Sequence, residues 1–171
     1  MEVFESIEQF LEKGGPVLFG IMVTTFILWS LIVERFLYFN VFHKEVVEKV
    51  RKQWEQRSDR KSWEARRVRD QLISDVRLNT TFGLGMIATM VALCPMLGLL
   101  GTVTGMVEVF DVMAITGSSN PRAMAGGVSK ATIPTMSGMV AALSGLYFSV
   151  RLQRHAHKEV LAAADHLELE H

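Results

Sequence analysis

The chain has 171 residues, of which 49% are hydrophobic, with 18 Lys+Arg and 18 Asp+Glu. Its formal net charge of zero argues against a nucleic-acid-binding protein, which would carry a basic excess. A single cysteine excludes an internal disulfide and a cysteine-based structural zinc site. The charges are unevenly distributed, since residues 14–33 and 82–107 carry none, while 12 basic residues lie within residues 35–77. This distribution indicates a membrane protein.

The N-terminal part of the chain predicts an amphipathic arm, residues 1–15, followed by a first membrane helix, residues 16–33. Pro16 suits the first turn of that helix. Its 18 residues would span about 27 Å, close to the thickness of the hydrocarbon layer. A buried helix of a soluble protein is the alternative, and two further apolar stretches argue against it. No cleavage site of a signal peptide is recognisable, so we expect a retained helix.

Residues 34–81 are rich in Lys, Arg, Glu and Gln and poor in Gly and Pro, a composition that favours helix. We expect a helical hairpin that bends at Ser58 and Asp59. Its charges are interpreted as a solvated face and, secondarily, as a contact for anionic lipid headgroups. Because Lys and Arg concentrate on the cytoplasmic side of membranes, the hairpin and the C-terminal tail are expected in the cytoplasm.

Two more apolar stretches, residues 82–110 and 131–150, predict the second and third membrane helices. The link between them, residues 111–130, contains turn-forming Gly, Ser, Asn and Pro, and is expected on the non-cytoplasmic side with the N-terminal arm. Residues 151–168 predict a cytoplasmic helix. Residues 169–171 resemble the start of an expression tag and are set aside. The predicted fold is therefore an all-α membrane protein with three spans and long cytoplasmic helical extensions.

The second and third spans each present a helical face of small residues interrupted by a threonine. These faces comprise Pro95, Gly98, Thr102 and Gly105 in the second span and Ala131, Thr135, Gly138, Ala142 and Gly145 in the third. Gly101 is expected to belong to the same packing surface of the second span. Such faces permit close helix packing within one subunit. They could alternatively line a space that several copies form around another chain's helix. Pro95 and Pro134 are expected to break their helices and free backbone carbonyls.

Ionisable groups at the centre of a span are the default functional sites of membrane proteins, and these spans have none. Cys94 is interpreted as a small buried residue, since no acid–base partner lies nearby in the sequence. No nucleotide-binding loop, catalytic triad or metal-ligand spacing is recognisable. The sequence therefore predicts a protein that is not an enzyme and holds no cofactor.

The tracts PMLGLLGTVTG (residues 95–105) and ATIPTMSG (residues 131–138) resemble the ExbB/TolQ/MotA proton-channel family. The three-span layout resembles ExbB and TolQ rather than the four-helix MotA. The tracts GGPVL (residues 14–18) and FDVMA (residues 110–114) are most similar to short ExbB forms that serve a second TonB system.

This resemblance implies a homopentamer in the bacterial inner membrane, with a periplasmic N-terminus, a cytoplasmic C-terminus and a central pore. The pore would enclose the single-pass helices of an ExbD dimer and use the proton-motive force to drive a TonB-like protein in outer-membrane transport. Thr102 and Thr135 match threonines of the family and would face the pore, whose wall the small residues would form. The carboxylate that carries the proton would belong to the partner.

Lys130 stands where many members of the family have a glutamate, which argues against a proton-relay role at this position. Glu108 is the acid nearest to the interior of a span and is interpreted as interfacial. Two other functions stay open: a TolQ-like stator of the Tol system, and a structural membrane scaffold without ion coupling.

Overall fold

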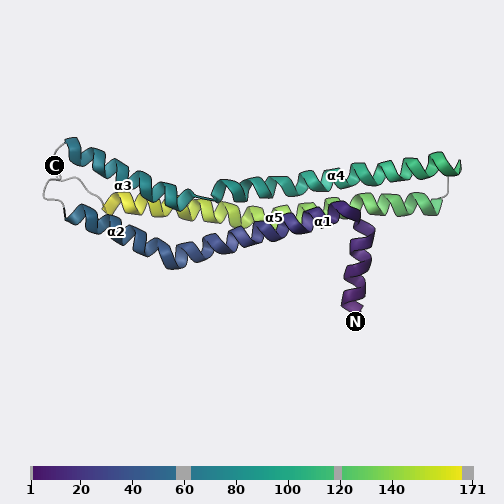
Figure 1. The fold of residues 1–171 in the computed structure, drawn as a ribbon, viewed down its shortest axis with the longest axis horizontal. Coiled ribbons are helices and arrows are strands. Elements are labelled where there is room, and N and C mark those ends of the chain that lie inside the picture. Colours follow the sequence, from purple (N-terminus) through teal and green to yellow (C-terminus); the bar gives the residue numbers. More distant parts are fainter. Residues whose placement is uncertain (1, 57–62, 118–120, 167–171) are drawn as a thin grey trace. The chain divides into compact units, whose positions relative to one another are not determined.

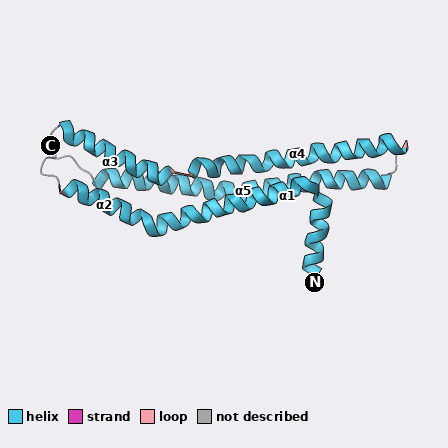
Figure 2. Ribbon diagram, in the orientation of Figure 1, coloured by secondary structure: helices cyan, strands magenta, loops and turns pink. Residues whose placement is uncertain are grey.

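The structure, a computed structural model, describes residues 2–56, 63–117 and 121–166. Every regular element in these ranges is helical (Figure 1, Figure 2). The elements are α1 (Glu2–Leu37), the π-helix η1 (Tyr38–Phe42), α2 (His43–Glu55), α3 (Trp63–Thr81), α4 (Leu84–Thr116) and α5 (Pro121–His166). The expected bend at Ser58 and Asp59 and the tag-like residues 169–171 lie outside the described residues.

Three stretches are long and apolar enough to cross a membrane: Gly14–Val41, Trp63–Ile115 and Met124–Asp165. The prediction of an all-α membrane protein is therefore confirmed. The helices extend further than the apolar runs, because α4 continues to Thr116 and α5 begins at Pro121, inside the expected link. Two compact units make up the chain. One contains residues up to Trp29 and Ala88–Leu146, and the other contains Ser30–Ile87 and residues from Tyr147 onward.

In the first unit, α1 changes direction at Gly15, as Figure 1 shows. Gly15 has φ 66° and ψ −170°, a conformation that glycine adopts without the steric cost other residues meet. Pro16 follows and resumes the helix, because its fixed φ suits a first turn and its missing N–H would have no helical partner there. The expected start of the first apolar helix at Pro16 thus coincides with this kink.

The core of the first unit lies where α1, α4 and α5 meet. Leu28 of α1 is completely buried, and Val91 of α4 is 8% exposed. A Cβ atom at Gly145 of α5 would lie 2.6 Å from Leu28 Cδ2 and 2.9 Å from Val91 Cγ2. The missing side chain of Gly145 is therefore what allows the three helices to pack at this level.

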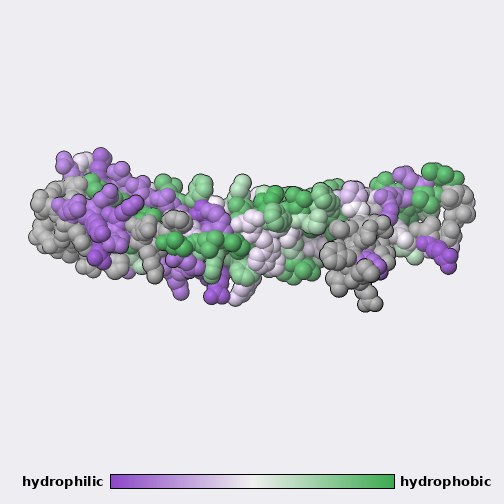
Figure 3. All heavy atoms as spheres, turned by 60° about the horizontal axis from the view of Figure 1, so that its bottom comes forward, coloured by the Kyte–Doolittle hydropathy of each residue, from purple (hydrophilic) through white to green (hydrophobic). Residues whose placement is uncertain are grey.

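The core of the second unit joins α2, α3 and the C-terminal part of α5. Its buried side chains are Val50, Trp54, Ala65, Val76, Val160 and Ala163. Hydrophilic side chains cover much of α2 and α3 around this core (purple in Figure 3). On α2, Lys52 Nζ lies 2.8 Å from Glu48 Oε1, and this hydrogen bond, with the Lys52 charge, lowers the pKa of Glu48. These helices thus combine a small apolar core with a charged outer face.

The prediction that Pro95 and Pro134 break their helices is wrong. Both prolines lie inside α4 and α5, which continue as single helices from Leu84 to Thr116 and from Pro121 to His166. A proline removes one backbone hydrogen bond, but the remaining bonds of a long apolar helix and its neighbours can keep it intact. Pro134 is among the most deeply buried side chains, and its ring packs against Gly101.

Candidate functional site

The small residues expected to form the site lie at the contact between α4 and α5 in the first unit. A Cβ atom at Gly98 would lie 3.0 Å from Thr135 Cα, and one at Gly105 would lie 2.7 Å from Ala131 Cα. At Gly138, a Cβ atom would lie 2.5 Å from the carbonyl oxygen of Cys94. None of these positions has room for a side chain, so the backbones of α4 and α5 approach as closely as glycine permits.

The other small residues of the predicted faces are also buried. Gly101 packs against the Pro134 ring, and Ala131 and Ala142 are only 4% and 9% exposed. The two faces therefore contact each other inside one subunit, as the alternative of close helix packing predicts. A wall that the same glycines and alanines form around a shared pore stays a prediction, because it concerns an assembly of several chains.

Thr135 connects α5 to α4 through its side chain. Its Oγ1 donates a hydrogen bond of 2.9 Å to the carbonyl oxygen of Gly98. In an α-helix this carbonyl is also the acceptor for the backbone N–H of Thr102, four residues later. The two threonines predicted for the site are thus associated with the same backbone carbonyl.

The Thr102 hydroxyl also donates to a backbone carbonyl, since its Oγ1 lies 2.6 Å from the Leu99 carbonyl oxygen. A hydroxyl has one proton to donate and two lone pairs with which to accept. Since both protons are used, Thr102 and Thr135 offer only acceptor sites to a further group, and both side chains are half-buried rather than enclosed. A water molecule or a protonated carboxylic acid can donate to such oxygens, whereas an ionised carboxylate cannot.

An ion pair also joins α4 and α5 near this contact. Lys130 Nζ lies 3.0 Å from Glu108 Oε2, and the two side chains are 46% and 54% exposed. The pair lies between the Gly105–Ala131 contact and a second close approach, where a Cβ atom at Gly127 would overlap the Val109 side chain. Sequence reasoning missed this pair because its members are 22 residues apart and only the antiparallel packing of α4 and α5 brings them together.

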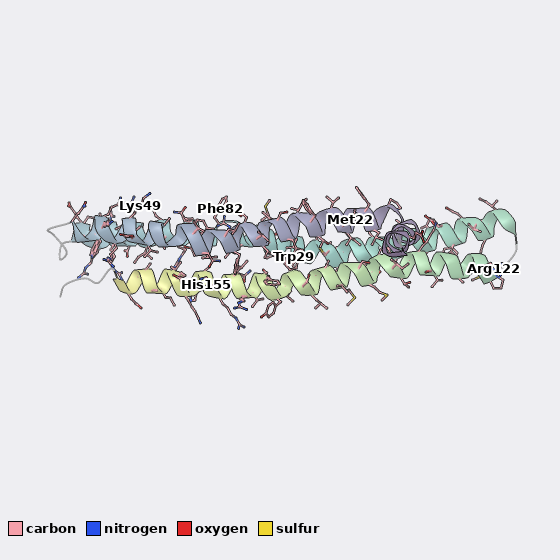
Figure 4. All side chains as sticks on the ribbon, turned by 90° about the horizontal axis from the view of Figure 1, so that it is seen from below. Met22, Trp29, Lys49, Phe82, Arg122 and His155 are labelled. Atoms are coloured by element: carbon pink, nitrogen blue, oxygen red, sulfur yellow. The ribbon has the colours of Figure 1, made fainter. Side chains whose placement is uncertain are left out.

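A groove of about 920 Å³ lies between α1 and α5 in the same unit. Met22 and Trp29, labelled in Figure 4, line it from α1. Two of its hydroxyls, those of Thr25 and Ser137, donate to carbonyls of their own helices at 2.7 and 2.8 Å. None of the described residues lining the groove is charged, so its surface suits hydrocarbon or another apolar helix.

Comparison with known proteins decides the family. The sequence model of the MotA/TolQ/ExbB proton channel family matches residues 34–164. The chain belongs to this family. The resemblance noted in the PMLGLLGTVTG and ATIPTMSG tracts is thereby confirmed, and both tracts lie inside the matched range.

Individual relatives point the same way. The ExbB-like 3 protein of Synechocystis sp. is 36% identical over 75 residues, 43% of this chain and 33% of that protein. The biopolymer transport protein exbB1 of Vibrio cholerae is 40% identical over 76 residues, 44% of this chain and 30% of that protein. The matches thus span about a third of these relatives. The ExbB-like 1 protein of Helicobacter pylori matches 89% of both chains at 25% identity.

The remaining site predictions stay open. Among the described residues, no group of three or more His, Cys, Asp or Glu side chains could hold a metal ion. The prediction that the protein uses no cofactor is not tested by this observation. The pore-facing position of Thr102 and Thr135 also stays a prediction, because it concerns an assembly of several chains.

Proposed function

We propose that the chain is a stator subunit of an ion-driven motor in the bacterial inner membrane, with its N-terminus in the periplasm and its C-terminus in the cytoplasm. Five copies surround the single-pass helices of an ExbD-like dimer. Together they use the proton-motive force to drive a TonB-like protein, which energises outer-membrane transport. Membership of a proton channel family and similarity to proteins named for biopolymer transport support this proposal.

The observation that carries the proposal is the hydrogen bond from Thr135 Oγ1 to the Gly98 carbonyl oxygen. The Thr102 hydroxyl donates in the same way to the carbonyl oxygen of Leu99, the residue after Gly98. Both threonine oxygens are left as acceptors in helices whose central turns carry no charge. When the partner's carboxylic acid is protonated, it donates a hydrogen bond to one of these oxygens. When it ionises, it loses that bond and must be solvated by water. The threonines therefore favour the neutral form of the carrier inside the membrane.

The carrier itself belongs to the partner, because α4 and α5 supply no carboxylate in their central turns. One proton moving through 100 mV releases about 2.3 kcal/mol, so a demanding mechanical step needs several protons. The protein's contribution is electrostatic and geometric: it holds hydrogen-bond acceptors at a fixed depth along the path of the partner's helix.

The proposal is tested by reconstituting the chain with an ExbD-like partner in lipid vesicles that contain a pH-sensitive dye. Proton flux should appear only when both proteins are present and a membrane potential is applied. A complex that assembles with the partner but conducts no protons under any potential would favour a structural scaffold. Copurification from cells with Tol-system proteins in place of TonB-system proteins would favour a TolQ-like stator.

A further inference from the structure

A second pocket, of about 520 Å³, lies in the unit formed by Ser30–Ile87 and the residues from Tyr147 onward. α3, the first turn of α4 and the C-terminal part of α5 line this open pocket, and its lining includes Arg77, Thr81, Leu84, Gln153, His157 and Val160. This volume is in the range of small-molecule sites in proteins. The mechanism proposed above does not use any of these residues.

The position of the pocket along the helices places it at a membrane surface. On one side, the charge-free run of the second span starts at Phe82, between Thr81 and Leu84 of the lining. On the other side, the third span (residues 131–150) ends three residues before Gln153, and Arg151 follows it. Figure 1 shows α3 next to the C-terminal part of α5. The pocket therefore lies at the level of the lipid headgroups, where spans pass from apolar to charged sequence.

The polar side chains of the pocket suit an anion. Arg77 supplies a permanent positive charge, and the His157 ring supplies an N–H donor in either protonation state. None of the described lining residues carries a carboxylate. The nearby Glu159 is oriented toward His155 instead, with 3.7 Å between its Oε1 and His155 Nε2. Charge-assisted hydrogen bonds from Arg to phosphate oxygens are among the strongest in proteins.

The pocket also offers acceptors and an apolar wall. Thr81 Oγ1 donates to the Arg77 carbonyl at 2.8 Å, so its lone pairs can accept from a hydroxyl group. Gln153 Nε2 lies 3.5 Å from Ser149 Oγ, and the Gln153 amide oxygen is a second acceptor. Leu84 and Val160 provide apolar surface beside these groups. Phosphate, hydroxyl and hydrocarbon are the chemical parts of a phospholipid with a hydroxylated headgroup.

We propose that this pocket binds the headgroup of an anionic phospholipid, with the phosphate at Arg77 and His157 and the headgroup hydroxyls at Thr81 and Gln153. A choline or ethanolamine headgroup would place an ammonium next to the Arg77 guanidinium, where like charges repel. The proposal rests on the membrane location of the chain and not on its proton-coupling role, so the two can fail independently.

The test places the intact protein in nanodiscs of phosphatidylglycerol and phosphatidylcholine. Native mass spectrometry then counts the phosphatidylglycerol molecules that stay bound after the protein is released from the nanodisc. Arg77→Gln should weaken phosphatidylglycerol retention about five-fold, the effect of one basic residue near a membrane surface. His157→Phe should also weaken it. The matched control is Arg154→Gln, which removes the same charge from an exposed position of α5 at the same level along the helices but outside the pocket lining.

Equal losses in the Arg77 and Arg154 variants would overturn the proposal, because they would show general attraction between a basic surface and an anionic membrane. Unchanged retention in the Arg77 variant would overturn it too. Displacement of the lipid by millimolar inorganic phosphate would show that the pocket is a site for the free anion and not for a headgroup. Thermal unfolding of each variant, measured in parallel, separates loss of lipid from loss of fold.

Discussion

At the scale of single residues, the proposed chemistry depends on which threonine hydroxyls already donate their proton to a backbone carbonyl. Threonine hydroxyls are common in membrane helices, where they usually bond to a carbonyl of their own helix. Thr102 and Thr132 follow that pattern, with acceptors at Leu99 and Ser129. Thr135 differs because its acceptor, Gly98, belongs to another helix. Its hydroxyl therefore affects both the α4–α5 contact and the acceptor sites offered to a partner.

Replacing Thr135 with valine keeps the side-chain shape and removes the hydroxyl. We expect proton-coupled transport to be lost while the oligomer still assembles, since one hydrogen bond contributes only about 0.5–1.5 kcal/mol to stability. TonB-dependent uptake in cells and the mass of the purified complex measure the two effects. Thr132→Val, an exposed change on the same helix, is the control and should retain transport. Normal uptake in the Thr135 variant would disprove its role.

The Glu108–Lys130 pair predicts a charge-dependent link between α4 and α5. Glu108→Lys or Lys130→Glu places like charges at a 3.0 Å contact and should lower the thermal stability of the complex. Exchanging both residues should restore most of it. Because both side chains are about half exposed, we expect a coupling of no more than about 1 kcal/mol in a double-mutant cycle. Additive effects of the two changes would show that the contact contributes nothing.

At the scale of helices, glycine sets the distance between α4 and α5. Gly98, Gly105 and Gly138 lie where a Cβ atom would meet the backbone of the opposite helix, which cannot move aside as a flexible side chain can. At Gly126, also in α5, a Cβ atom would have no neighbouring heavy atom within 4 Å. The same residue type thus has a packing role at some positions of these helices and none at another.

This difference gives a matched pair of substitutions. Gly138→Ala should destabilise the protein by about 1–3 kcal/mol, because the new methyl group forces α4 and α5 apart. Gly126→Ala should be neutral or should stabilise α5 by up to about 1 kcal/mol through its higher helix propensity. Thermal unfolding in detergent compares the two. Equal behaviour of both variants would contradict the close contact at Gly138.

At the scale of the whole molecule, many large apolar side chains of the spans are exposed in the single chain. Phe26, Leu99 and Met136 are 73%, 63% and 68% exposed. Inside a membrane such surfaces meet either lipid or other protein chains, and helices associate there mainly through packing and hydrogen bonds. The proposed assembly assigns part of this surface to neighbouring copies and to the partner's helices.

The assembly itself is open to a direct measurement. We expect native mass spectrometry of the complex copurified with an ExbD-like partner to give five copies of this chain and two of the partner. Without the partner, we expect the five-copy ring to persist. A monomer or dimer of this chain under conditions that preserve the partner complex would contradict the proposed ring.

The sequence by itself determined the helical fold, the three spans and the family. Charges are costly in hydrocarbon, so membrane helices appear as runs of uncharged residues such as 14–33 and 82–107. The family was recognisable from the tracts at residues 95–105 and 131–138. The sequence also located the small-residue faces that bring α4 and α5 together. It could not determine what those faces contact, since helical periodicity gives a direction but not a neighbour.

Only the tertiary structure decided that the glycine faces meet each other, that Thr135 bonds to Gly98, and that Glu108 pairs with Lys130. It also showed that α4 and α5 continue through Pro95 and Pro134. Each of these facts depends on residues far apart in the sequence or on packing that offsets a local preference. The physical reason is that hydrophobic burial in a membrane is a property of each segment, whereas hydrogen bonds, ion pairs and close backbone contacts are properties of pairs.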